Sequence, residues 1–126
     1  MSRQHLDLGR SGEELAVKFL KENNYKILNR NYKTSLGEID IIALDKDVLC
    51  FIEVKTRKQN RFGLPQEAVT SFKQKQISNC ALSFLKAKKL LDKKARFDIV
   101  AVNCSDKACE VKLIKNAFYL EGRFSY

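Results

Sequence analysis

The stretch that decides the fold runs from Gly37 to Arg57 and reads GEIDIIALDKDVLCFIEVKTR. Two apolar runs, 37–44 and 48–56, flank the polar residues "DKD" at 45–47. Apolar runs of this length around a polar turn are typical of two antiparallel strands. The stretch therefore predicts a β-hairpin in the middle of the chain.

Charged side chains interrupt both arms of this hairpin. They are Glu38 and Asp40 in the first arm, and Glu53 and Lys55 in the second. Burying charge is costly unless the groups are paired or bind a metal ion. Pairing of the arms can bring Asp40 close to Glu53 and Lys55. Two adjacent carboxylates repel each other, and a divalent cation such as Mg²⁺, which accepts one or two protein carboxylates and keeps several waters, removes that repulsion.

Alternation along each strand predicts which side chains share a face of the sheet. In the first arm, one face carries Glu38, Asp40, Ile42 and Leu44, and the other carries Ile39, Ile41 and Ala43. In the second arm, one face carries Phe51, Glu53, Lys55 and Arg57, and the other carries Cys50, Ile52, Val54 and Thr56. An alternative to a metal site is a structural ion pair of Lys55 with Glu53 or Asp40 on a solvated face.

A helix is expected before the hairpin. Ser11 can cap the segment GEELAVKFLKEN that follows it. At 100° per residue, Glu13 falls at the edge of the apolar stripe and could face the sheet. Glu14 points to the opposite side, where it can pair with Lys18. The alternative for Glu13 is a carboxylate that only complements the helix dipole.

A longer helix is expected after the hairpin. Pro65 suits its start, and the helical period runs over 66–89, with a break near Ser71 left open. Its predicted apolar stripe consists of Val69, Phe72, Ile77, Cys80, Ala81 and Phe84. Lys73 and Gln76 also fall in this stripe, whereas Lys75 points away. Lys73 either extends to water or, beside a metal site, holds a substrate phosphate.

The remaining segments complete one α/β domain over residues 1–126. Further strands are expected at 25–32, 95–103 and 109–116, followed by a tail that packs back on the body. The order of helix, three strands, helix and two strands indicates a mixed sheet rather than a doubly wound one. No linker or change in composition divides the chain.

The balance of charge points to a polyanion as partner. The chain has 24 Lys and Arg against 15 Asp and Glu, a net charge of +9 and an isoelectric point near 9.5. Nucleic acid is the simplest such partner, although ribosome-associated and membrane-surface proteins are also basic. No apolar run approaches the roughly 18 residues that span a bilayer, and the polar start of the chain is not a signal peptide, so we expect a cytoplasmic protein.

The four cysteines do not form a metal motif. None belongs to a C-x-x-C pair, and His5 alone offers no zinc partner. Cys50 and Cys80 fall at positions expected in the core. We therefore expect a chain without disulfides, which suits a reducing cytosol.

Several segments, taken in order, resemble the YraN family of uncharacterised bacterial proteins. They are GEELAVKFLKENNYKILNRN, GEIDIIA, FIEVKTR, EAVTSFKQKQI and RFDIVAV, which together extend from about Gly12 to Val102. That family looks like a branch of the PD-(D/E)XK nuclease superfamily, similar to archaeal Holliday-junction resolvases and restriction endonucleases. The resemblance implies a restriction-endonuclease-like core with helix, three strands, helix and strands around one mixed sheet.

The resemblance assigns roles to individual residues. Asp40 matches the metal-binding Asp of the second strand, and Glu53 and Lys55 match the (D/E)-x-K of the third. Glu13 matches the Glu that resolvase-like members carry on the first helix, and Lys73 or Gln76 matches a polar residue on the following helix. Ile39 stands where the motif has Pro, and Glu38 has no role to transfer.

The resemblance thus implies a Mg²⁺-dependent nuclease, with Mn²⁺ as a substitute, acting on DNA and in particular on branched or repair intermediates. Asp40, Glu53 and the carbonyl of Val54 would hold the metal, with Glu13 completing the shell, and Lys55 would position or activate the attacking water. The residues expected to contact nucleic acid are Lys33, Arg57, Lys58, Arg61, Lys73 and Gln76. By analogy with resolvases, a homodimer is expected.

Two other functions compete with this one, because nuclease-like folds also host proteins that bind without cleaving. The first is a catalytically inactive module that binds nucleic acid without a metal and with a steep dependence on salt. The second is an interaction protein whose charged sheet face docks an acidic partner.

Overall fold

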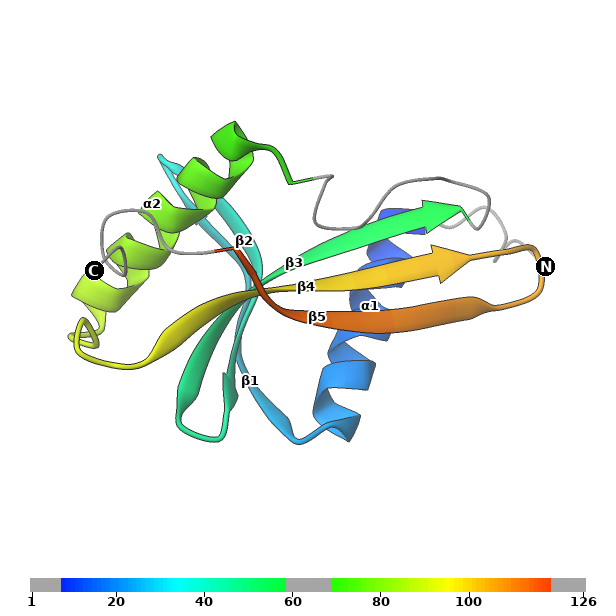
Figure 1. The fold of residues 1–126 in the computed structure, drawn as a ribbon, viewed down its shortest axis with the longest axis horizontal. Helices are drawn as coiled ribbons and strands as arrows, with labels where there is room; N and C mark the ends of the chain where they lie inside the picture. Colours follow the sequence, from blue (N-terminus) through cyan, green and yellow to red (C-terminus); the bar gives the residue numbers. More distant parts are fainter. Residues whose placement is uncertain (1–7, 59–68, 119–126) are drawn as a thin grey trace.

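The computed structural model describes residues 8–58 and 69–118. Two helices and five strands follow one another in the predicted order and form one α/β unit (Figure 1). The elements are α1 (Leu8–Glu22), β1 (Tyr25–Thr34), β2 (Gly37–Asp45), β3 (Val48–Lys58), α2 (Ser71–Ala87), β4 (Ala95–Cys104) and β5 (Cys109–Phe118). The predicted strands and the central hairpin are confirmed, with ends that differ by two residues or fewer.

The sheet is mixed, with strand order β1-β2-β3-β4-β5. All neighbours are antiparallel except β3 and β4, which are parallel. Parallel neighbours cannot be joined by a tight turn, and the connection between β3 and β4 carries α2. This single mixed sheet confirms the predicted fold class and is consistent with a restriction-endonuclease-like core.

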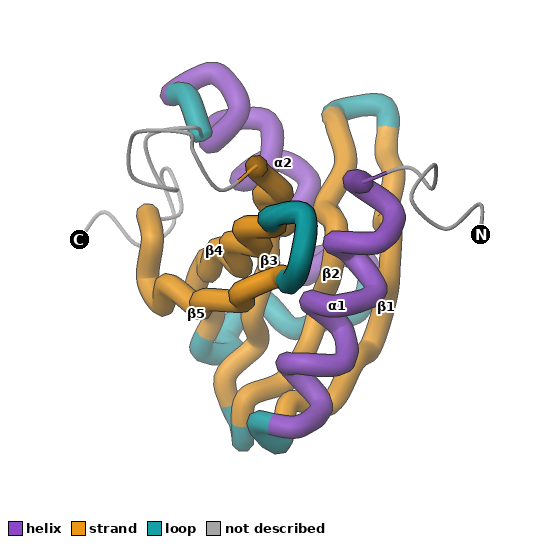
Figure 2. Tube along the Cα trace, turned by 90° about the vertical axis from the view of Figure 1, so that its right-hand side faces the viewer, coloured by secondary structure: helices purple, strands orange, loops and turns teal. Residues whose placement is uncertain are grey.

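The helices cover opposite faces of the twisted sheet (Figure 2). On the α1 face, Leu20 packs with Cys50 and Ile52 of β3. On the α2 face, Phe84 packs with Phe51 of β3, their ring centroids 6.0 Å apart. The predicted alternation of β3 is therefore confirmed, and it puts Glu53 and Lys55 on the α2 side of the sheet.

The predicted alternation of β2 is wrong at one position. Ile41 and Ala43 belong to the α1-side core as expected, but Ile39 lies in the α2-side core with Ile42. Alternation holds only while a strand keeps its pleat and direction. The change of side between Ile39 and Ile41 falls at Asp40, where β2 leaves β3.

The start of α1 differs from the prediction, and α2 begins at the break that the sequence left open near Ser71. The helix α1 begins at Leu8, so Ser11 lies inside it and is not its cap. The helix α2 begins at Ser71 and is capped by Thr70, whose hydroxyl accepts a hydrogen bond from the Lys73 N–H over 3.2 Å. The start predicted at Pro65 lies outside the described residues. Phe72 was expected in the core, yet 72% of its surface is exposed.

Two pairs of cysteines behave differently. Cys50 and Cys80 are buried and free, as expected. Cys104 and Cys109, however, are joined by a disulfide across the β4–β5 turn, so the expectation of a disulfide-free chain is wrong. The turn holds the two strand ends at a Cα–Cα distance of 4.0 Å, and the short spacing in the sequence did not reveal that proximity.

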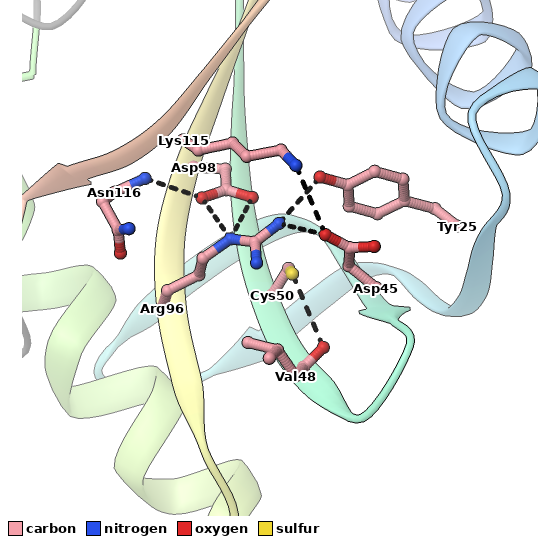
Figure 3. A network of polar contacts seen from close by, with 8 residues as sticks. All are labelled: Tyr25, Asp45, Val48, Cys50, Arg96, Asp98, Lys115 and Asn116. Atoms are coloured by element: carbon pink, nitrogen blue, oxygen red, sulfur yellow. Dashed lines mark hydrogen bonds and ion pairs between the residues drawn. The ribbon is translucent and has the colours of Figure 1, made fainter.

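A polar network crosses the sheet on its α1 side, at the end where β4 begins (Figure 3). Arg96 donates to both carboxylate oxygens of Asp98 over 3.0 Å and to Asp45 and the Tyr25 hydroxyl over 2.8 Å. Asp98 is completely buried and also accepts from the N–H of Asn116, which lies where the β4–β5 register shifts. Burial raises the pKa of Asp98 in spite of this guanidinium. The network thus joins β1, β2, β4 and β5, although these strands are far apart in the sequence.

Candidate functional site

The site begins where β2 and β3 separate. Their ladder runs from Asp45–Val48 to Ile41–Ile52, and residues 37–39 of β2 remain paired with β1. Asp40 is the next residue of β2 after the last of these pairs. Its Oδ2 accepts a hydrogen bond of 2.8 Å from the backbone N–H of Val54. The Asp40 carboxylate thus accepts the hydrogen bond from a backbone N–H of β3 that would have paired with the β2 backbone if the ladder had continued.

The surroundings of Asp40 favour its protonated form. Burial is the largest cause, and the negative charge of Glu53 is the next; together they raise the pKa of Asp40 to about 7. Glu13 and Glu38 act in the same direction, while the hydrogen bond from Val54 opposes them. Carboxyl groups from α1, β2 and β3 therefore lie close enough to Asp40 to repel its charge.

Glu53 lies next to two ammonium groups. Its side chain is only 6% exposed, and its Oε2 is 3.4 Å from Nζ of Lys55 and 3.5 Å from Nζ of Lys73. Lys55 follows on the same face of β3, and Lys73 reaches over from the first turn of α2. The Glu53–Lys55 ion pair is one that the sequence had offered as an alternative to a metal site.

Glu13 approaches the same region from α1. Its side chain is 19% exposed and accepts a hydrogen bond of 3.0 Å from the side-chain amide of Asn31. Arg30 is 3.5 Å from Glu13 and 2.8 Å from Glu14. Glu14 is 62% exposed, as expected for a surface charge, and it forms an ion pair with Arg30 of β1.

The approach of α1 depends on a glycine. A Cβ added at Gly12 would overlap Oγ1 of Thr56 on β3, so the helix backbone lies directly on that strand. Glu13 is the next residue along the helix. The absence of a side chain at Gly12 therefore brings Glu13 to the end of the sheet where β2 and β3 separate.

Asn31 was not among the predicted site residues. Its neighbours Arg30 and Tyr32 pair with Ile41 and Ile39, so Asn31 lies opposite Asp40. It adopts a φ of 54°, a conformation that Asn tolerates better than most residues. An Asn in the middle of a strand is unusual. The NRN run at 29–31 was therefore a signal for a special position.

The donors at this point suit a hard cation. No three Asp, Glu, His or Cys side chains of residues 11–58 and 69–118 form a group that could hold a metal ion. The expected carboxylate ligands Asp40, Glu53 and Glu13 are therefore not brought together as a group of three, and what remains of the expected set is Asp40 and Glu53 with a backbone carbonyl. In a β-strand the N–H and C=O of one residue point to the same side. The carbonyl of Val54 therefore lies on the edge of β3 that faces Asp40, and Mg²⁺ needs few protein ligands.

The residues predicted to contact nucleic acid are spread around this end of the molecule. Lys33 is exposed opposite Glu38, Lys58 is exposed at the end of β3, and Arg57 is half-buried. Gln76 lies against the start of β2, where a Cβ added at Gly37 would be 3.4 Å from the Cβ of Gln76. Arg61 lies outside the described residues. Lys73 forms an ion pair of 3.5 Å with Glu53, a predicted metal ligand.

Fold and site together define an α/β protein with a mixed sheet and a partly buried cluster of acids and lysines at one end of its central hairpin. The chain belongs to the uncharacterised protein family UPF0102, whose model matches residues 12–102, and this confirms the resemblance to the YraN family. A UPF0102 protein of Geotalea daltonii is 54% identical over 90% of both chains. One of Geobacter metallireducens is 48% identical over 95% of this chain and 98% of its own. No helix in the described part of the chain has the length and apolar character needed to cross a membrane.

Proposed function

We propose that this protein is a cytosolic, Mg²⁺-dependent nuclease that hydrolyses phosphodiester bonds in DNA. The observation that carries the proposal is the arrangement of Asp40 and Glu53. Burial and, after it, the charge of the buried Glu53 raise the pKa of the partly buried Asp40 to about 7, and the Lys55 ammonium group lies beside Glu53. Such a pair is unfavourable without a counter-charge, and sites with shifted pKa values are often functional sites.

Each residue has a role in this reaction. Mg²⁺ held by Asp40, Glu53 and the Val54 carbonyl would neutralise the carboxylates and stabilise charge on the scissile phosphate. Lys55 would orient the attacking water, whose oxygen bonds to phosphorus as the bond to the leaving sugar oxygen breaks. Lys73 would turn from Glu53 to a phosphate oxygen of the substrate. Glu13, held by Asn31, would complete the acidic surface.

The net charge of +9 supports DNA as the substrate. A basic protein attracts the phosphate backbone irrespective of sequence, and its affinity falls as salt rises. Lys33, Lys58 and Lys73 lie around the acidic residues and would contact that backbone. Branched or repair intermediates are the class of DNA proposed.

The test combines metal binding with cleavage. Titration calorimetry with Mg²⁺ or Mn²⁺ should give binding to the wild type and none to an Asp40→Asn/Glu53→Gln variant. Cleavage of linear, flapped and four-way DNA should be lost in Asp40→Asn and Lys55→Ala. Asp92→Asn and Lys112→Ala change exposed residues in the same way and serve as controls. Cleavage that survives Asp40→Asn and Lys55→Ala would refute the proposal.

A second function has an observation of its own in its favour. Lys55 and Lys73 already balance the charge of Glu53 without a metal. That balance suits a module that binds nucleic acid and does not cleave it. This module would bind DNA in the presence of a chelator, and its affinity would survive Glu53→Gln.

A further inference from the structure

An exposed aromatic side chain lies next to the proposed active site. Phe72 is 72% exposed, more than the other large exposed apolar side chains of the described residues, Leu28, Leu36 and Leu91. It directly precedes Lys73, whose ammonium group is 3.5 Å from the carboxylate of Glu53. The ring therefore projects from the helix turn that supplies a contact to the site.

The turn that carries Phe72 is held firmly on both sides. Val69, just before the helix, is 2% exposed in the α2-side core, and its carbonyl accepts a 2.9 Å hydrogen bond from Gln74. Thr70 caps the helix through the Lys73 N–H. The exposed Phe72 therefore belongs to a helix start whose backbone is held in place.

The surroundings of the ring are basic and contain a second apolar group. The helix α2 has no Asp or Glu between Ser71 and Ala87 and carries Lys73 and Lys75 near the ring. Gln76, one turn after Phe72, lies against Gly37 at the start of β2. The neighbouring Leu36 is 49% exposed. An exposed aromatic ring on a helix start that carries two lysines and no acidic residue has the chemistry of a surface on which nucleic-acid bases stack.

We propose that Phe72 stacks against an unpaired base of the DNA strand whose phosphate Lys73 would hold, with Leu36 at the edge of this stacking surface. The inference rests on the proposed function and adds the substrate class, namely DNA with a single-stranded base beside the cleaved bond. A base inside a duplex has both faces covered by its neighbours, whereas an unpaired base offers a face to the ring. Stacking of this kind tolerates any sequence.

The chain contains no Trp, which makes a direct measurement possible. A Phe72→Trp variant carries a single indole at the proposed surface, and Leu91→Trp carries one at another exposed apolar position, between α2 and β4. With a chelator present, an oligothymidylate of about 12 nucleotides is titrated into each variant. We expect quenching of the indole in Phe72→Trp by the single strand, weaker quenching by a duplex of equal length, and no change in Leu91→Trp.

Affinity gives a second readout on the same oligonucleotides. Phe72→Ala should bind the single strand roughly 5- to 100-fold more weakly than the wild type, the loss expected for one stacked base. Phe72→Tyr should restore binding, and duplex binding should change by less than about twofold, because phosphate contacts dominate it.

Three results would overturn the inference. The first is unchanged single-strand affinity in Phe72→Ala, and the second is no measurable binding of the single strand by the wild type. The third is indole emission that changes with protein concentration alone, together with a dimer that Phe72→Ala abolishes, since the ring would then contact a second copy. Cleavage is measured separately, with metal present. Cleavage without the stacking contact would refute only this inference, and stacking without cleavage would refute only the proposed nuclease activity.

Discussion

The backbone N–H of Val54 donates to Oδ2 of Asp40 over 2.8 Å. This bond joins β3 to a side chain of β2 at the point where the two strands no longer pair. It fixes the position of Asp40. Because the N–H and C=O of one strand residue point to the same side, the Val54 carbonyl also lies on the edge of β3 that faces Asp40. One hydrogen bond thus positions two of the oxygen donors in the proposed metal site.

Asp40 should make the stability of the protein dependent on pH. The folded carboxyl has a pKa of about 7, against 3.8 for the ordinary group, so the folded state holds a proton that the unfolded state releases between these values. The stability that this proton provides is complete below the ordinary pKa and is lost as pH rises through about 7. Asp40→Asn should therefore be more stable than the wild type at pH 8, by at most about 4 kcal/mol.

Urea unfolding at pH 5 and pH 8 measures this difference. The gap between Asp40→Asn and the wild type should widen toward pH 8, and Mg²⁺ should narrow it by stabilising the wild type alone. Asp92→Asn, at an exposed site, controls for the general effect of removing a negative charge. A wild type that is as stable as Asp40→Asn at pH 8 without metal would contradict the prediction.

Asn31 should support Glu13 rather than the fold. Asn31→Gly keeps the φ of 54° accessible and removes only the amide that donates to Glu13. We expect Mn²⁺ affinity to fall by at most about 10-fold, because Asn31 would orient an acid that lies beside the proposed metal ligands and outside the set that holds the ion. Calorimetry on Asn31→Gly and Asn31→Ala, by metal titration and by thermal unfolding, separates the loss of metal affinity from the loss of stability. The Ala variant should lose additional stability from backbone strain, whereas equal affinities in Asn31→Gly and the wild type would exclude the role.

Replacing Gly12 by Ala should destabilise the protein, although Ala is usually preferred to Gly inside a helix. In an open helix position, Gly→Ala stabilises by about 1 kcal/mol. At Gly12 the new Cβ would overlap Thr56, and overpacking costs about 1–3 kcal/mol, so Gly12→Ala should be destabilised. Thermal or urea unfolding shows whether Gly12→Ala is less or more stable than the wild type. Adding Thr56→Ala should recover much of the loss, and additive effects of the two changes would contradict direct contact.

The network around Arg96 should matter for stability and not for metal binding. Arg96→Ala leaves Asp98 buried without its guanidinium, which typically costs about 3–5 kcal/mol. Lys115→Ala, at a side chain that is 55% exposed, should cost less than about 1 kcal/mol. Denaturant unfolding of both variants tests this difference. If Arg96→Ala is too unstable to study, Arg96→Lys keeps the charge and should lie between them.

Much of the fold followed from the sequence because its signals are local. Alternation predicted the faces of β3, and helical periodicity selected Glu13 over Glu14 as the acid nearer the sheet. The turn 45–47 marked the hairpin that brings Asp40 and Glu53 together.

The errors arose where tertiary structure overrides local pattern. Ile39 changes side because β2 leaves β3, which no alternation reveals. Phe72 has the helical spacing of a core residue but lies on the exposed side of the first turn. The partner of Cys104 depended on how closely the β4–β5 turn brings the strand ends together.

The separation of β2 from β3 has a consequence for the order of folding. The β2–β3 hairpin forms between residues close in sequence, so Asp40 and Glu53 can meet early, when Lys55 of the same hairpin is present but the second counter-charge, Lys73, is not. Lys73 arrives only when α2 docks and β4 pairs with β3 across the longest connection in the chain. Acid pH or added Mg²⁺ should therefore speed refolding, because either relieves the repulsion between Asp40 and Glu53 when the hairpin forms. The residues of the proposed active site would thus slow the folding of the protein.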